Sequence, residues 1–62
     1  MSRVHKRRED ARQRVLETAT ALFASNGFAE TSIASIAGEA DVSVGSFYNL
    51  FENKEALYRE LI

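Results

Sequence analysis

The sequence predicts an all-α domain, and three observations lead to that class. Apolar residues recur every three to four positions along most of the chain, which is the period of an amphipathic helix. The 62 residues include no proline and only three glycines, so few positions interrupt a helix. The length allows one small domain, near the lower limit for folding without cross-links, and there is no cysteine to form a disulfide. We therefore expect short helices that are stabilised by packing on one another.

The first helix is expected over about residues 10–25, where the apolar side chains form one broad face. A glycine, Gly27, follows Asn26 directly, and glycine adopts the left-handed conformation that ends many helices without steric cost. Phe28 lies just beyond it and is expected to fold back onto the helix. The residues of the apolar face are Val15, Leu16, Ala19, Leu22 and Phe23.

Two short helices joined by a sharp turn are expected next, over about residues 32–51. The hydroxyl of Thr31 or Ser32 caps the first of them, which runs to about Ala40. The helical pattern breaks at residues 41–42, and Ser43 restarts it as the N-cap of a helix over about 44–50. The aromatic pair Phe47 and Phe51 is spaced four apart and is expected to face the core.

A fourth helix is expected from Lys54 onward, with Asn53 as its N-cap. Its apolar residues continue to the last position, Ile62. We therefore expect the helix to continue in a longer parent protein, so that the 62 residues are a fragment.

The charges are distributed unevenly between the two ends of the chain. Residues 1–14 carry six basic and two acidic side chains, a balance of +4, whereas residues 15–62 carry two basic and seven acidic ones, a balance of −5. Residues 1–9 are thus expected to be a flexible basic arm in front of a domain over 10–62. Such an arm indicates a nucleic-acid partner, or alternatively a solvated leader that only aids solubility.

Several classes of function are excluded by composition. A single histidine, His5, and no cysteine cannot form a nucleophilic triad or a usual metal site. The glycines fit neither a dinucleotide fingerprint nor a phosphate-binding loop. No apolar run reaches the roughly 18 residues that a membrane span needs, and no apolar core follows the basic start as in a signal peptide. We therefore expect no enzyme activity, no cofactor, no metal and no membrane association.

The segment over residues 32–51 has the plan of a helix-turn-helix, whose second helix enters the major groove of DNA. The run VSVGSFYNLFENKEALY at residues 42–58 closely resembles the recognition helix and linking helix of the tetracycline-repressor (TetR) family. The resemblance covers about residues 10–62 and includes the apolar positions of the first helix, Gly27-Phe28, and Thr31-Ser32-Ile33.

That resemblance implies a DNA-binding domain with its recognition helix at about residues 43–51. Members of the family are homodimeric repressors that bind palindromic double-stranded DNA operators. A larger C-terminal domain, absent from these residues, binds a small-molecule effector and forms the dimer. The implied location is the bacterial cytoplasm, at the nucleoid.

Site residues can be assigned by combining the resemblance with side-chain chemistry. An asparagine can pair bidentately with adenine, so Asn49 is expected to carry sequence information. The family commonly has histidine or tyrosine at the position of Leu50, so a polar contact there is lost or replaced by packing. Hydroxyls at helix starts can bond phosphates or simply cap the helix, and both roles can hold at once. The base-facing candidates are Ala34, Val44, Gly45, Ser46 and Asn49; the phosphate-facing candidates are Thr31, Ser32, Ser43, Tyr48 and Lys54.

One feature of the sequence argues against strong DNA binding. No lysine or arginine occurs from Val15 to Asn53, although phosphate neutralisation dominates the affinity of DNA-binding proteins. We therefore expect Lys6, Arg7 and Arg8 of the arm, together with Lys54, to supply the cations. The alternative is a helical protein-interaction module, with an apolar fourth helix that docks a partner and no contact with DNA.

Overall fold

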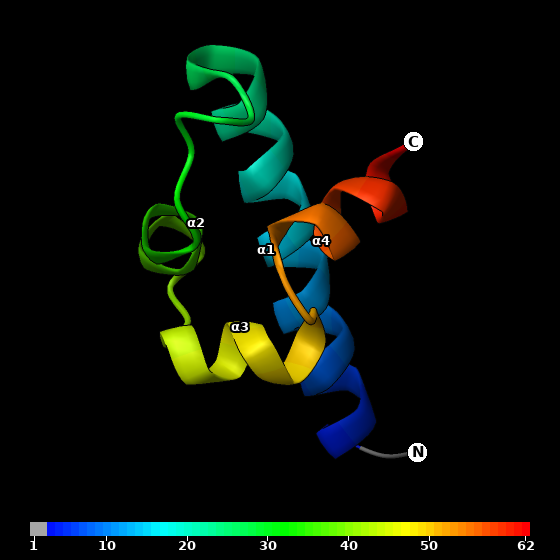
Figure 1. The fold of residues 1–62 in the computed structure, drawn as a ribbon. Coiled ribbons are helices and arrows are strands. Elements are labelled where there is room, and N and C mark those ends of the chain that lie inside the picture. Colours follow the sequence, from blue (N-terminus) through cyan, green and yellow to red (C-terminus); the bar gives the residue numbers. More distant parts are fainter. Residues whose placement is uncertain (1–2) are drawn as a thin grey trace.

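A computed structural model of the chain describes the backbone of residues 3–62 and the side chains of residues 9–62. Over that range the chain forms four helices and no strand (Figure 1), so the predicted all-α class is confirmed. The helices are α1 (Arg3–Asn26), α2 (Ile33–Ala40), α3 (Val44–Leu50) and α4 (Lys54–Leu61).

The longest helix, α1, begins earlier than the sequence predicted. Residues 3–9 were expected to be a flexible arm, but their backbone continues α1 as far as Arg3. No glycine or proline precedes Gly27, and lysine, arginine and glutamate are good helix formers. At its other end, α1 stops as predicted: Gly27 is left-handed (φ 91°), and its N–H donates to the Phe23 carbonyl over 2.9 Å.

The predicted starts of the three short helices are confirmed, because side-chain caps define them locally. The hydroxyl oxygen of Ser32 accepts a hydrogen bond from the Ser35 N–H at the start of α2 (3.0 Å). Ser43 does the same for α3 (3.0 Å), and the side-chain oxygen of Asn53 accepts from the backbone of α4 (2.7 Å). Each cap satisfies an N–H that the helix itself leaves without a partner.

The turn between α2 and α3 is made by a residue in an unusual conformation. Asp41 is left-handed, with φ 63° and ψ 43°, a region that costs roughly 1–2 kcal/mol for a residue with a Cβ and less for aspartate. The next residue, Val42, donates its N–H to the Ala37 carbonyl over 2.9 Å. This bond closes the end of α2 and directs the chain into α3.

Replacing Asp41 by glycine is expected to stabilise the domain by about 0.5–1 kcal/mol, since glycine adopts this conformation without strain. For a domain of this size that change raises the melting temperature by about 2–8 °C, which thermal unfolding followed by circular dichroism would detect. The matched control is Glu39→Gly, which also removes one exposed carboxylate but places glycine inside α2, where it should destabilise. A lower melting temperature for Asp41→Gly would contradict this account of the turn.

The core lies where α1, α2, α3 and the start of α4 meet. Helix α1 packs on α2 and on α4, and α2 packs on α3 (Figure 1), so α1 supports α2 and α4 directly and α3 is held mainly through α2. Phe28 folds back as predicted, with its ring centroid 5.2 Å from that of Phe23. The buried apolar side chains are Val15, Ala19, Ile36, Ala37, Ala40, Phe47, Phe51 and Leu57.

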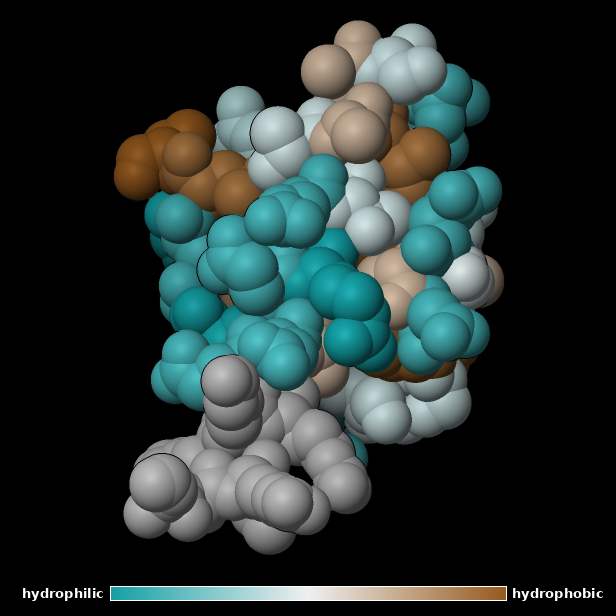
Figure 2. All heavy atoms as spheres, turned by 180° about the vertical axis from the view of Figure 1, so that it is seen from behind, coloured by the Kyte–Doolittle hydropathy of each residue, from teal (hydrophilic) through white to brown (hydrophobic). Residues whose placement is uncertain are grey.

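The face opposite to the view of Figure 1 is mainly hydrophilic, and a hydrophobic area marks the end of the chain (Figure 2). Ile62 at that end is 86% exposed and Tyr58 on α4 is 42% exposed. None of the helices over residues 3–62 is both long and apolar enough to span a bilayer.

Candidate nucleic-acid interface

Helix α3 has a buried side and an exposed side, and the predicted base-facing residues lie on the exposed one. Phe47 is fully buried, which orients the helix on the core. Of the other residues of α3, Leu50 is half-buried and the remaining five are exposed. We call these exposed residues the outer arc: Val44, Gly45, Ser46, Tyr48 and Asn49. Ala34 is also exposed, on α2.

Two serines at the start of α3 are linked to each other. Ser43 accepts a hydrogen bond from the Ser46 N–H over 3.0 Å, and its hydroxyl donates to the Ser46 hydroxyl oxygen over 3.0 Å. A serine hydroxyl carries one hydrogen and two lone pairs, so Ser46 keeps its own O–H for an outside acceptor. The capping role and a role at the DNA are therefore compatible for this pair.

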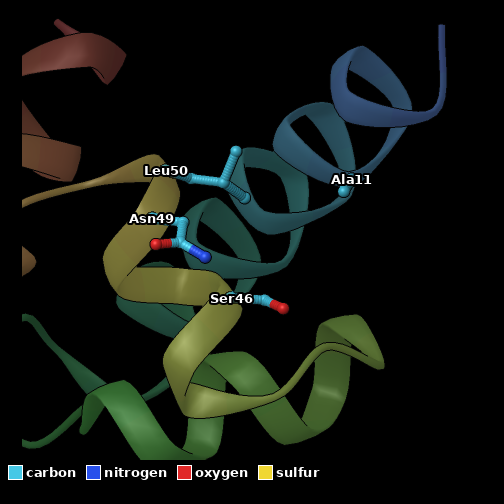
Figure 3. Close-up of a pocket in the computed structure, with 4 residues that line it drawn as sticks. All are labelled: Ala11, Ser46, Asn49 and Leu50. Carbon is cyan, nitrogen blue, oxygen red and sulfur yellow. The ribbon is translucent and has the colours of Figure 1, made fainter. Parts of the chain in front are cut away.

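A hollow of about 200 Å³ lies between α3 and the first half of α1. It is lined by Ala11, Ser46, Asn49 and Leu50, and the amide of Asn49 and the hydroxyl of Ser46 reach its open side (Figure 3). Leu50, whose orientation the sequence left ambiguous, is half-buried and packs against the core. Ala11 was not predicted as a site residue, since nothing in the local sequence indicates that α1 runs beside α3.

The prediction that Thr31 contacts phosphate is wrong. Its side chain is only 2% exposed, and its hydroxyl donates to the Gly27 carbonyl over 2.7 Å, with the Leu22 carbonyl at 3.3 Å. The hydroxyl satisfies carbonyls at the end of α1, where the helix has no N–H of its own to offer them. Ser32, and not Thr31, is the exposed cap of α2.

Lys54 has a role inside the domain that the sequence did not indicate. Its ammonium donates to the carbonyls of Phe28 (2.6 Å) and Thr31 (2.9 Å), and it lies 4.3 Å from the centre of the Phe28 ring. Lys54 therefore ties the start of α4 to the loop between α1 and α2. An ammonium has three N–H donors, so one is left for the phosphate contact that was predicted.

The two arginines of α1 with described side chains also have partners within the domain. Arg14 donates from Nε to the Ala40 carbonyl at the end of α2 over 3.1 Å. Arg12 forms an ion pair with Glu60 of α4 and lies 5.3 Å from the centre of the Phe51 ring. These contacts join residues 26 to 48 positions apart, so no local sequence signal could have revealed them.

The side chains of Lys6, Arg7 and Arg8 lie outside the described residues. Their backbone belongs to the N-terminal turns of α1, and that end of α1 extends beyond α3 (Figure 1). The basic residues are therefore carried on a helix that runs past the outer arc.

Comparison with known protein families decides the class of the chain. Residues 15–61 match the family model described as bacterial regulatory proteins, tetR family. The chain belongs to the tetR family. The resemblance inferred from residues 42–58 is thereby confirmed, and the fold and the outer arc of α3 belong to a DNA-binding domain that regulates transcription.

Curated relatives of the tetR-family chain are named as transcriptional regulators and not as enzymes. "Uncharacterized HTH-type transcriptional regulator YerO" of Bacillus subtilis (strain 168) is 46% identical over 48 residues, which are 77% of this chain and 17% of the relative. "Probable acrEF/envCD operon repressor" of Escherichia coli (strain K12) is 44% identical over 50 residues, 81% of this chain and 23% of the relative. "HTH-type transcriptional repressor DhaR" of Mycobacterium sp. (strain GP1) is 41% identical over 49 residues, 79% of this chain and 25% of the relative.

The aligned region is a small part of each relative. It spans between 16% and 27% of the length of the curated relatives that the chain matches. The similarity therefore concerns the DNA-binding domain.

Proposed function

We propose that this tetR-family domain binds a palindromic operator as part of a homodimer, with α3 in the major groove, and represses transcription. The observation that carries the proposal is the exposed, uncharged outer arc of α3, held in place by the buried Phe47. Two-fold symmetry of the protein requires half-sites about one helical turn, or a multiple of it, apart. Two of the three relatives described above are named repressors, which supports repression over activation.

The proposed contacts divide into those that read bases and those that hold the backbone. Asn49 and Ser46, with the edge formed by Val44 and Gly45, face the bases, because they occupy the outer arc. The DNA phosphates are held by the side chains of Ser32, Ser43 and Tyr48, and by the one ammonium N–H of Lys54 that has no hydrogen-bond partner among the described residues. Ala34, exposed on α2, lies at the margin of the base-reading surface.

Release from DNA is proposed to depend on a small-molecule effector bound outside this chain. None of the described residues, 9–62, forms a cluster of three or more possible metal ligands, and no catalytic set is found among the residue types that the sequence provides. Dimerisation is likewise proposed to occur mainly through a further domain. The proposed location is the bacterial cytoplasm, at the nucleoid, where the operator is found.

The test compares two variants on operators selected from random DNA duplexes. Asn49→Ala is expected to relax the base preference at one position of each half-site. There the difference in binding free energy between the preferred base and the other bases should fall by about 1–3 kcal/mol. Tyr48→Phe removes only a hydroxyl and is expected to weaken all sequences alike. Fluorescence-anisotropy titration against the preferred duplex and its single-base variants measures both effects.

Gln13→Ala is the matched control for Asn49→Ala, because it also removes an exposed amide but lies on α1 and does not line the hollow. It should leave the base preference unchanged. An unchanged preference for Asn49→Ala would show that α3 does not read bases through this residue. Binding that prefers no sequence at all, even at low salt, would overturn the proposed function.

A further inference from the structure

The hollow beside α3 combines apolar and polar groups in a way that the proposed function does not yet use. Ala11 and Leu50 supply methyl groups, and Ser46 and Asn49 supply a hydroxyl and an amide at its open side (Figure 3). The two polar residues belong to the outer arc, so the hollow opens on the surface that faces the bases. A volume of about 200 Å³ admits the edge of one base.

The lining discriminates between the chemical groups that DNA presents. None of the four lining residues carries a charge, so a phosphate would enter without a cation to neutralise it. Ala11 and Leu50 instead favour an apolar group. In the major groove the only such group is the C5-methyl of thymine, which lies next to the O4 acceptor of the same base.

The O4 atom of thymine needs a hydrogen-bond donor, and the hydroxyl of Ser46 can supply one. Ser43 donates its hydroxyl hydrogen to the Ser46 oxygen over 3.0 Å, so the Ser46 hydroxyl hydrogen remains available for an acceptor that enters the hollow. Thymine O4 accepts such a hydrogen, whereas cytosine offers an N4–H₂ donor at the equivalent place and has no methyl. Leu50 thus matches the methyl of thymine and Ser46 matches its O4 acceptor. The two residues are four positions apart and so lie next to each other on α3.

We propose that the hollow formed by Ala11, Ser46, Asn49 and Leu50 is a thymine-reading site, in which Leu50 and Ala11 contact the C5-methyl and Ser46 donates to O4. This assignment rests on the proposed function, because it requires α3 to lie in the major groove. It adds a first-helix residue, Ala11, to the base-reading surface. It also assigns apolar specificity to Leu50, where the family more often has a polar side chain.

The experiment replaces each thymine of the selected operator by uracil, one at a time. Uracil keeps O4 and the base pairing and lacks only the methyl, so the protein itself is unchanged. At one thymine of each half-site, affinity is expected to fall about fourfold, the factor that corresponds to one lost methyl contact. At the other thymines it should be unaffected.

Two variants then assign the effect to the hollow. Leu50→Ala should reduce the difference between thymine and uracil at that position, because the methyl loses its contact with Leu50 and keeps only the one with Ala11. Ser46→Ala should weaken binding at the same thymine about fivefold, as expected for one lost hydrogen bond, but should keep the difference between thymine and uracil. Circular dichroism checks that each variant is folded. If Leu50→Ala does not fold, the uracil series with the unchanged protein still tests the methyl contact.

The outcomes separate this proposal from the one on which it rests. A methyl effect at one thymine per half-site that is reduced in Leu50→Ala supports the thymine site. Specific DNA binding that is indifferent to uracil at every position overturns the thymine site and leaves the proposed function intact. Failure to select any preferred sequence overturns both.

Discussion

Replacing Phe47 by alanine is expected to unfold most of the domain. The side chain is fully buried and packs against Phe51, with ring centroids 5.7 Å apart. Truncating a buried phenylalanine costs about 3–5 kcal/mol, whereas a chain of 62 residues has a total stability of roughly 3–9 kcal/mol. Urea denaturation followed by circular dichroism should show the transition shifted to low urea or lost.

Tyr48→Ala is the control for this prediction, since it truncates the neighbouring aromatic residue of the same helix. Tyr48 is 52% exposed, so the same loss of a ring should cost far less stability. Equal destabilisation by both variants would mean that Phe47 does not orient α3 on the core. Because Phe47→Ala acts on folding, any loss of DNA binding in that variant says nothing about base contacts.

Neutralising the four basic residues at the start of α1 is expected to weaken DNA binding by roughly two orders of magnitude at moderate salt. The variant changes Arg3, Lys6, Arg7 and Arg8 to glutamine, which keeps a good helix former at each position. If all four contact phosphates, the slope of log affinity against log salt should fall by about 3–4 for each subunit bound, or about 0.9 per contact. Titrations at several salt concentrations measure both quantities.

The reason for this expectation is that the cations with described side chains near α3 already have partners. Arg12 pairs with Glu60, Arg14 donates to Ala40, and Lys54 donates to two carbonyls. The outer arc itself is uncharged. Arg59→Gln, a change of one exposed cation on α4, is the control and should have a small effect. A salt slope that stays constant in the fourfold variant would assign the phosphate contacts to other residues.

The helices could be predicted from the sequence because their ends are determined locally. Ser32, Ser43 and Asn53 cap N–H groups three residues ahead of them, and Gly27 ends α1 through its own conformation. The start of α1 was missed for the opposite reason. The basic run has no apolar periodicity, and the helix continues there only because nothing interrupts it.

The candidate site could be predicted in part. The exposure of Gly45, Ser46, Tyr48 and Asn49 follows from the helical period once Phe47 and Phe51 are assigned to the core. The burial of Thr31 and the internal bonds of Lys54 could not be predicted, because their partners come from other elements. For Lys54 the partners are the carbonyls of Phe28 and Thr31, 26 and 23 positions away. The contribution of Ala11 to the hollow likewise depends on how α1 crosses α3.

The proposed contacts imply that sequence preference and salt dependence can be redesigned separately in this domain. The residues proposed to read bases carry no charge, whereas the basic residues are concentrated in the first two turns of α1. Exchanging outer-arc residues with those of a relative would therefore change the operator and leave the ionic-strength response nearly constant. Exchanging the first eight residues would do the reverse. A library of regulators with different operators and a common working salt range could be built on this one scaffold.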